Sequence, residues 1–423
     1  MVNRDAPPPR AWVIVAMLFL FMVVNFASKA VLGLAAVPIM TELHLSHDAF
    51  GTLSASFFYL FSLSCLVTGF IVNRINTTTV IFVMALVWGV CQLAAIGTVS
   101  FELLLMSRLA LGVGEGPAFP VGTHAIYKWF PNKRRTLPSA IFSQGASFGV
   151  VITLPALNWL LLTLSWHWAF GVIGVIALFW AALWFWLGAE GPIGDPQHEA
   201  QPSRPIPYRR LIFNRTMISA WLSGFGSYWG VALLVSWFTP FLVEGLGFSQ
   251  RQAGWLSTVP WALSILFAIA GSWVSERLID RGVSSRIARG VYGGGMVAIG
   301  GLALVLLPLI QSEILAFIAL VLGLSLGSVI YAMQPAIIAE LTPVEQRGSL
   351  LAIGTAIWSL SGVVAPVVMG HLIDAGSNAA QSYREGFVVA GSVALVTGLI
   401  GMMLMQPEAT RAKLLQATSV KEG

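Results

Sequence analysis

Apolar segments of about 20 residues recur along almost the whole chain. Hydrophobic residues make up 57% of its 423 residues and charged residues only 10%, whereas a soluble domain carries about 25% charged residues. A helix of about 20 apolar residues is long enough to cross the hydrocarbon core of a bilayer. Twelve segments have about this length, at residues 12–37, 50–72, 78–98, 101–124, 140–162, 168–188, 217–242, 252–274, 290–310, 314–333, 348–371 and 386–405. We therefore predict an all-α integral membrane protein with twelve transmembrane helices.

The distribution of basic residues predicts how these helices are oriented. Loops that stay in the cytoplasm are enriched in Lys and Arg. Of the 23 Lys and Arg residues, Lys29 and Arg108 lie inside predicted spans, and only Arg251 and Arg384 fall on loops assigned to the outer side. The others lie on the tails and after even-numbered spans, so we expect both termini in the cytoplasm and the protein in the inner membrane. The net charge of +5 is spread over several short loops, which does not favour nucleic-acid binding.

The longest polar connection divides the chain into two halves. It is rich in Pro, Gly and Arg, a composition typical of a linker. We predict an N-terminal six-helix bundle at 1–188, a cytoplasmic linker at 189–215, a C-terminal six-helix bundle at 216–406 and a cytoplasmic tail at 407–423. The halves also repeat faintly, because Pro131 and Arg135 after the fourth span correspond to Pro343 and Arg347 after the tenth. Two parallel six-helix repeats are the architecture of the major facilitator superfamily, in which the substrate site lies between the halves.

Several longer motifs resemble one branch of that superfamily. They are Gly112-Val-Gly-Glu115-Gly-Pro-Ala-Phe-Pro120, Lys128-Trp-Phe-Pro131, Ser165-Trp-His-Trp168-Ala-Phe and Ser275-Glu-Arg-Leu-Ile-Asp-Arg281-Gly-Val-Ser-Ser-Arg286-Ile-Ala-Arg289. Together they make essentially the whole membrane domain similar to the anion:cation symporter family, which includes hexuronate, galactonate and phthalate permeases. The resemblance implies a transporter, not an enzyme, whose partners are a small organic anion, protons and the lipid bilayer. We expect a monomer without a cofactor or a metal.

Lys29 lies in the outer half of the first predicted helix, close to Asn25 and Ser28. Its long side chain could extend to the outer interface, or it could bind the carboxylate of a substrate. In the resembled family this position looks like the Arg of an Asp-Arg pair, which is replaced here by Ser28-Lys29. The ammonium group of Lys is a point charge, whereas the planar guanidinium group of Arg offers two parallel N–H donors to a carboxylate. The replacement also removes an acid that is a second candidate for proton coupling in relatives.

Arg108 and Glu115 are seven residues apart on the fourth predicted helix. Both side chains therefore face the same side, about 10 Å apart along the helix axis. Charges in hydrocarbon are costly and are functional by default. Arg108 could bind a carboxylate or pair with Glu115, and a purely structural ion pair is the alternative. Glu115 is the only acidic residue well inside a predicted span, so we expect it to carry the proton, coupled to Arg108.

The second half offers neutral candidates for the rest of a substrate site. We expect substrate contacts from Tyr228, Thr355, Trp358 and Ser359, with Gln144 and Tyr59 of the first half; packing and helix-helix hydrogen bonding are the alternative for each. Phe26 and Phe61 occupy positions where sugar-acid transporters of the resembled family often carry Tyr. The site is therefore comparatively apolar, which favours an aromatic or short aliphatic carboxylate and leaves a sugar acid open.

Six residues at helix ends resemble the cytoplasmic gate of the same family. They are Asn73, Arg74, Arg135, Glu276, Arg277 and Arg347, and Asn73 replaces an Asp that usually strengthens this gate. For the histidines at 44, 47, 124 and 167 we expect surface or capping roles rather than pH sensing.

The leading hypothesis is a secondary active transporter that imports a small organic anion by proton symport with alternating access. An organic-acid exporter or antiporter is the alternative within transport. A non-transporting membrane sensor or an intramembrane enzyme is less favoured, because the sequence has neither an attached soluble domain nor a catalytic set of residues.

Overall fold

The computed structural model describes residues 8–71, 76–131, 134–193 and 206–419. These residues form helices and no strand. The first half of the chain contains α1 (Pro9–Leu34), α2 (Ala36–Glu42), α3 (His47–Ile71), α4 (Thr77–Leu93), α5 (Phe101–Glu115), α6 (Ala118–Trp129), α7 (Thr136–Thr163) and α8 (Trp166–Leu187). The predicted linker at 189–215 contains α9 (Tyr208–Ile212), and its residues 194–205 lie outside the described ranges.

The second half contains more short helical pieces than the first. They are α10 (Arg215–Ser236), α11 (Phe238–Pro240), η4 (Phe241–Gly245), α12 (Gln250–Leu256), α13 (Val259–Asp280), η5 (Arg286–Val291), α14 (Tyr292–Val305), η6 (Leu307–Leu309), α15 (Glu313–Leu326), α16 (Val329–Leu341), α17 (Val344–Ser359), α18 (Ser361–Ala375), α19 (Ala379–Leu404) and, in the predicted tail, α20 (Pro407–Ser419).

Ten helices among the described residues are long and apolar enough to cross a membrane. The other two predicted spans are present in a different form. Helix α4 is apolar but has only 17 residues, and the predicted span 101–124 is divided into α5 and α6. The division has a local cause, because Pro117 has no N–H with which to continue α5. The twelve-helix fold is confirmed, but the fourth span is broken next to Glu115.

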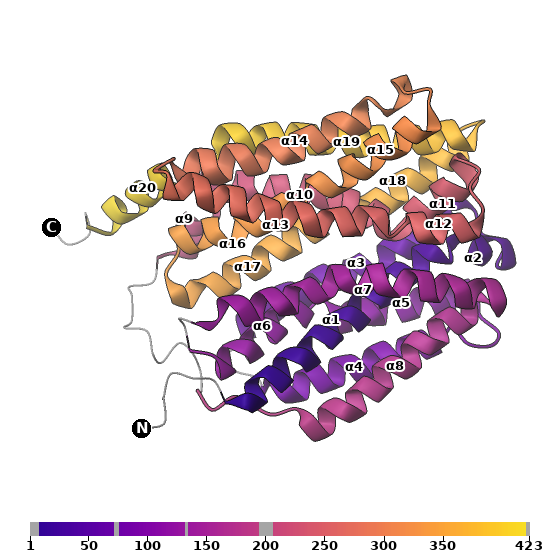
Figure 1. Ribbon diagram of the computed structural model, residues 1–423, viewed down its shortest axis with the longest axis horizontal. Coiled ribbons are helices and arrows are strands. Elements are labelled where there is room, and N and C mark those ends of the chain that lie inside the picture. Colours follow the sequence, from indigo (N-terminus) through magenta and orange to yellow (C-terminus); the bar gives the residue numbers. More distant parts are fainter. Residues whose placement is uncertain (1–7, 72–75, 132–133, 194–205, 420–423) are drawn as a thin grey trace.

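Two helical bundles lie side by side, with α1–α8 in one and α10–α19 in the other (Figure 1). The start of α1 and the end of α20 lie at the same end of the molecule, called the terminal end below. The opposite end, where α2, α11 and α12 lie, is called the far end below. This arrangement places the contact surface between the bundles along the length of the spans.

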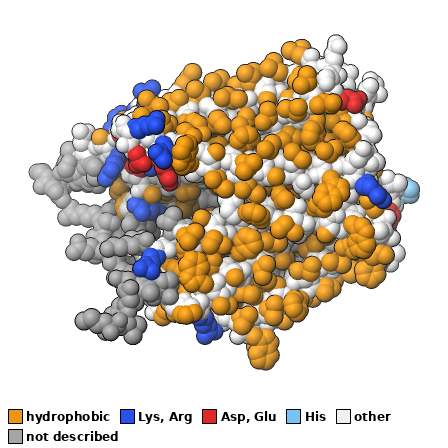
Figure 2. Space-filling view, in the orientation of Figure 1, with side chains coloured by type: hydrophobic (Ala, Val, Ile, Leu, Met, Phe, Trp, Pro, Cys, Tyr) orange, Lys and Arg blue, Asp and Glu red, His pale blue; other side chains and the backbone are white. Residues whose placement is uncertain are grey.

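The surface between the two ends is covered by hydrophobic side chains (Figure 2). Large apolar residues in the middle of helices are strongly exposed, including Phe179 of α8 at 64% and Ile269 of α13 at 56%. Such a surface is unfavourable in water but suits a hydrocarbon environment. Lys and Arg side chains gather mainly at the terminal end, as Figure 2 shows, which agrees with the distribution that the sequence predicts.

The two halves repeat a specific contact at the terminal end. Arg135 follows α6 and Arg347 lies in the first turn of α17. Each guanidinium donates to backbone carbonyls five and eight residues earlier, through Nε at 2.9 and 3.3 Å and through Nη2 at 3.2 and 2.9 Å. A cation at a helix C-terminus satisfies carbonyls that have no partner within the helix. The faint sequence repeat therefore corresponds to a repeated end contact of α6 and α16.

Candidate functional site

Two glycines bring helix α5 against α3. A Cβ atom on Gly112 would lie 2.2 Å from the Phe57 carbonyl oxygen, and one on Gly116 would lie 2.4 Å from the Phe61 carbonyl oxygen. Neither position has room for a side chain, so the two backbones can approach only because both residues are Gly. Glu115 lies between these two contacts, at the end of α5. The close packing therefore places its carboxylate deep inside the first bundle.

The carboxylate of Glu115 is paired with the ammonium group of Lys29. Lys29 Nζ lies 3.3 Å from Glu115 Oε2, and the side chains are 8% and 0% exposed. Nζ also donates to Asn25 Oδ1, one turn earlier on α1, at 2.8 Å. The alternative in which Lys29 extends to the interface is therefore wrong, because its charge points into the protein. A buried ion pair is stable only when further hydrogen bonds satisfy its charged groups. Lys29 has such a bond to Asn25, whereas neither oxygen of Glu115 has a hydrogen bond within the described residues.

Aromatic rings surround the Lys29 ammonium on its other sides. Nζ lies 4.4 Å from the ring centre of Phe26, 4.8 Å from that of Phe61 and 5.7 Å from that of Phe57. The faces of such rings stabilise a cation. Glu115 is the only acidic residue that forms an ion pair with Lys29 in the described part of the chain, so one ligand carboxylate would suffice to take its place.

Arg108 is buried at 2% exposure but does not pair with Glu115. Its Nη2 donates to Gln92 Oε1 at 3.0 Å, its Nη1 lies 3.4 Å from the Ser28 carbonyl oxygen, and the guanidinium lies over Phe170 at 5.3 Å. These partners belong to α4, α1 and α8, all in the first bundle. Of the two possibilities left open for Arg108, the direct pair with Glu115 is therefore absent, because Lys29 reaches Glu115 while Arg108 is held by an amide and a carbonyl.

An aromatic path joins this ion pair to the second bundle. Phe58, next to the Lys29 cluster on α3, lies 6.0 Å from Tyr228 of α10. Tyr228 in turn lies 5.9 Å from Trp358 of α17, and Tyr331 of α16 stacks on Trp358 at 4.8 Å. Two expected substrate residues, Tyr228 and Trp358, thus belong to one group of rings that crosses the interface between the halves.

The remaining expected substrate residues are dispersed. Ser359 shares a buried hydrogen bond of 2.7 Å with Ser62 across the interface. Thr355 bonds to a carbonyl of its own helix at 2.9 Å, and Gln144 is half-buried on α7. Tyr59 is 52% exposed, on the side of α3 that turns away from the ion pair. The structure therefore brings Ser359 to the interface but does not place Tyr59 with the central rings.

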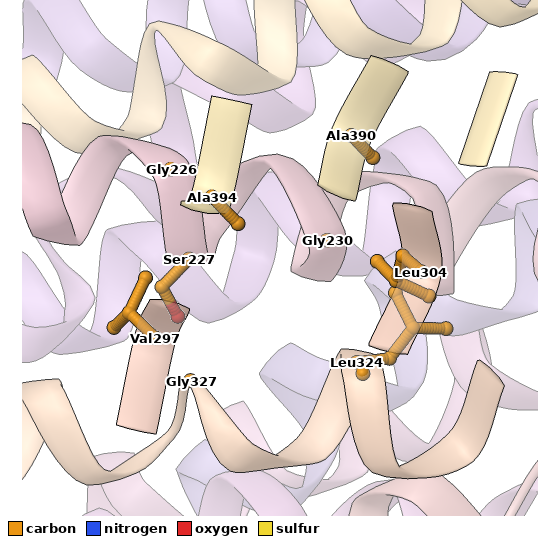
Figure 3. Close-up of a pocket in the computed structure, with 10 residues that line it drawn as sticks. Gly226, Ser227, Gly230, Val297, Leu304, Leu324, Gly327, Ala390 and Ala394 are labelled. Atoms are coloured by element: carbon orange, nitrogen blue, oxygen red, sulfur yellow. The ribbon is translucent and has the colours of Figure 1, made fainter. Parts of the chain in front are cut away.

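A separate cavity lies inside the second bundle (Figure 3). It is lined by Gly226, Ser227, Gly230, Val297, Leu304, Gly323, Leu324, Gly327, Ala390 and Ala394. The space is about the size of one water molecule, and Ser227 is the lining residue with a polar side chain. We interpret it as a packing gap between small residues, unsuited to an organic anion.

At the far end, five residues form a polar cluster across the two halves. His47 of α3 lies between two carboxylates of the second half, with Nδ1 2.8 Å from Asp374 Oδ1 and Nε2 3.2 Å from Glu244 Oε2. The backbone N–H groups of His47 and Asp48 donate to the Asp374 carboxylate at 3.2 and 2.8 Å. The Tyr383 hydroxyl donates to Glu244 at 2.7 Å. His47 is partly exposed, as a surface role requires, but its ring also joins the two halves. We call this group of five residues the far-end cluster.

The predicted gate residues differ in their surroundings. Arg135 and Arg347 bind helix ends, as described above. Glu276 and Arg277 are exposed, and the Arg277 guanidinium lies over the Trp273 ring at 5.2 Å. Asn73 and Arg74 lie outside the described residues. Arg135 and Arg347 thus contact helix ends at the terminal end of the molecule. The role of the six residues in a cytoplasmic gate stays a prediction.

Sequence reasoning missed Gln92 and the acidic partners of His47. A Gln within an apolar segment is itself a signal of a buried polar contact, so Gln92 could have been selected. The partners of His47 lie 197 and 327 residues away in the sequence, and no local pattern predicts that distance.

The fold and its motifs match known transporters. The chain matches the family model of the Major Facilitator Superfamily over residues 18–335 and 221–421. The D-galactonate transporter of Escherichia coli is 24% identical, with 96% of this chain and 97% of that protein covered. The hexuronate transporter of Bacillus subtilis is also 24% identical, with 96% of each covered. The probable sulfoacetate transporter of Cupriavidus necator is 24% identical, with 93% of each covered.

Solved structures agree with this fold. A bacterial homologue of the human lysosomal transporter Spinster, in an inward-facing and unoccupied conformation, superimposes with a TM-score of 0.78 at 20% identity, covering 97% of this chain and 99% of that one. A D-xylose-proton symporter superimposes with a TM-score of 0.76 at 16% identity, covering 94% and 99%. This chain belongs to the major facilitator superfamily and is a membrane transporter rather than an enzyme.

Proposed function

We propose that this transporter imports a small organic anion together with a proton by alternating access. The observation that carries the proposal is the buried Lys29–Glu115 pair, at 3.3 Å, beside an aromatic path that reaches the second half. The relatives named for galactonate, hexuronate and sulfoacetate support an anionic substrate. Phe26 and Phe61, which lie against the Lys29 ammonium group, offer no hydrogen bond to a hydroxyl, which favours an aromatic or short aliphatic carboxylate over a sugar acid.

Coupling follows from competition for one cation. When a substrate carboxylate binds Lys29, Glu115 loses its partner in a buried site. A buried carboxylate without a cation is strongly unfavourable, so Glu115 takes up a proton. When the substrate leaves, Lys29 returns to Glu115 and the proton is released. Proton and anion would thus be bound together and released together.

Arg108 has a supporting role in this scheme. It is held by Gln92 and by the Ser28 carbonyl, so it fixes the part of α1 that carries Lys29. The substrate would therefore meet Lys29 rather than Arg108.

Orientation completes the proposal. With both termini in the cytoplasm, the far-end cluster would close the outer side, and the Arg135 and Arg347 contacts would belong to the cytoplasmic gate. An exporter would run the same cycle in reverse, and an antiporter would bind the proton and the anion alternately. The direction of the proton-driven flux in oriented proteoliposomes separates both alternatives from import by symport, since acid outside should drive uptake only in a symporter.

Carboxylate binding is expected to depend on Lys29. A ligand that binds only the folded state stabilises it by about 2.7 kcal/mol at 100 times its Kd. We expect at least one of benzoate, butyrate, D-galactonate and D-glucuronate to raise the melting temperature of the purified protein, and Lys29→Gln to abolish the shift.

The controls separate binding from folding. Lys29→Gln leaves Glu115 unpaired, so the double variant Lys29→Gln/Glu115→Gln should regain thermal stability without regaining the ligand response. Lys128→Gln removes another paired lysine, which contacts Glu190 at 2.6 Å near the terminal end, and should keep the response. An unchanged shift in Lys29→Gln would contradict the assignment of Lys29 to the substrate.

A further inference from the structure

A lysine is an incomplete partner for a carboxylate. Arginine offers two parallel N–H donors, one for each carboxylate oxygen, whereas an ammonium group is a point charge. In this chain the position that faces Glu115 is Lys29, so a substrate carboxylate at Lys29 would have one oxygen without a matching donor. A second donor close to Nζ would correct this.

Asn25 has such a donor in the required place. It lies one turn before Lys29 on α1, is 1% exposed, and accepts the 2.8 Å hydrogen bond from Lys29 Nζ through Oδ1. Because an ammonium group can only donate, the amide oxygen must face it. The orientation of the amide is therefore fixed by chemistry, and Nδ2, bonded to the same carbon as Oδ1, is turned to the adjacent position.

Nδ2 of Asn25 is buried and has no hydrogen-bond partner among the described residues. A buried donor without an acceptor costs about 1–3 kcal/mol, and native structures contain few of them. Both carboxylate oxygens of Glu115 likewise lack a hydrogen bond within the described residues, and Oε2 has only the ion pair with Lys29. The cluster around Lys29 thus contains one N–H donor without an acceptor and a carboxylate without a hydrogen bond.

We propose that Asn25 Nδ2 and Lys29 Nζ together bind the two oxygens of the substrate carboxylate, with Asn25 supplying the donor that lysine lacks. The inference rests on the proposed function and adds a binding residue to it. Lys29 keeps its hydrogen bond to Asn25 Oδ1 while it exchanges Glu115 for the substrate. At that stage Glu115 is protonated, and a neutral carboxyl group is stable without a cation beside it.

The test is a double-mutant cycle between Asn25 and Lys29. Kd is measured by calorimetry on the full-length protein, for the tightest binder among benzoate, butyrate, D-galactonate and D-glucuronate. Asn25→Ala should weaken binding about 10- to 100-fold, the range for a hydrogen bond to a charged group. In the Lys29→Arg background the same change should cost less than about threefold, because arginine supplies both donors itself.

Two further variants keep the outcome interpretable. Asn25→Asp retains size and acceptor but removes the donor, so it should weaken binding at least as much as Asn25→Ala. Ser219→Ala removes a fully buried hydroxyl of α10 that is bonded within its own helix, and should leave Kd unchanged.

The possible results distinguish the two proposals. Equal losses from Asn25→Ala in both backgrounds, or no loss in either, would overturn the role of Asn25 while anion binding at Lys29 stands. Equal losses would mean that Asn25 acts only through the structure of α1. No loss in either background would mean that Asn25 Nδ2 does not contact the substrate. If no panel member binds the wild-type protein, or if Lys29→Gln binds normally, the proposed function fails and the inference fails with it.

Discussion

Glu115→Gln is expected to abolish proton-driven accumulation of the substrate while leaving exchange of substrate across the membrane intact. Gln has the shape of a protonated Glu but cannot release a proton, so Lys29 stays available to the carboxylate in every state. Binding and substrate-for-substrate counterflow should therefore persist, whereas an inward proton gradient should no longer drive uptake. The wild-type protein should lose accumulation when a protonophore removes the gradient.

Proteoliposomes with a radiolabelled substrate measure both activities on the same preparation. Glu190→Gln is the matched control, because Glu190 also pairs with a lysine but lies outside the spans. Although burial alone would raise the pKa of Glu190, hydrogen bonds from Lys128, the Thr78 amide and the Thr77 hydroxyl hold it below its usual value. It therefore stays ionised near neutrality, and its replacement should leave coupling unchanged. Proton-driven accumulation by Glu115→Gln would show that another group carries the proton.

The membrane fold could be predicted from the sequence because apolar length is a local property. The break at Pro117 could not be placed on that basis, although the missing N–H of Pro is also local, because many spans tolerate Pro. Helix α7 continues through Pro155, for example. The missing N–H is therefore necessary for the break but not sufficient, and at Pro117 it coincides with the close approach of α5 to α3 at Gly112 and Gly116.

The charged residues could be selected from the sequence, but not their pairing. Lys29, Arg108 and Glu115 each stand out because an ionisable group in an apolar segment needs a partner. Which cation reaches Glu115 depends on how α1 and α5 face each other. The spacing within α5 predicts only that Arg108 and Glu115 share one face of that helix, and it says nothing about Lys29. The adjacent residues Phe58 and Tyr59 make the same point, because only one of them faces the second half and composition does not indicate which.

His47→Asn is expected to open the far end of the transporter. The substitution removes both ring contacts, at 2.8 Å to Asp374 and 3.2 Å to Glu244. A hydrogen bond to a charged group contributes about 1.5–3 kcal/mol, so the population with an open far end should rise about tenfold or more. Without the His47 ring between them, the carboxylates of Asp374 and Glu244 would also repel each other, which further destabilises the closed far end.

Labelling from the far side measures this opening. In a variant without Cys65 and Cys91, Tyr228→Cys places a thiol on the central aromatic path, where a membrane-impermeant reagent reaches it only when the far end is open. His47→Asn should accelerate labelling about tenfold or more. His44→Asn is the control, because His44 is exposed and its φ of 51° is one that Asn adopts readily. Equal labelling rates in the His47→Asn variant and its parent would refute the closing role of the cluster.

In the same assay, the labelling rate should depend on pH because His47 gains or loses a proton. A neutral imidazole donates from one nitrogen only, whereas both ring nitrogens of His47 face carboxylates, so both contacts form only with the protonated ring. Labelling of the parent should therefore accelerate as the pH rises and the ring loses its proton, after correction with an exposed reference cysteine at Gln381. His47→Asn should be fast at every pH. Three other imidazole rings lie at this end: His371, whose Nδ1 is 3.9 Å from Asp48, His167, whose Nε2 is 3.4 Å from Glu42, and the exposed His44. Replacing any of them by Asn should retain the pH dependence of the parent, because the two carboxylates that hold His47 remain in place.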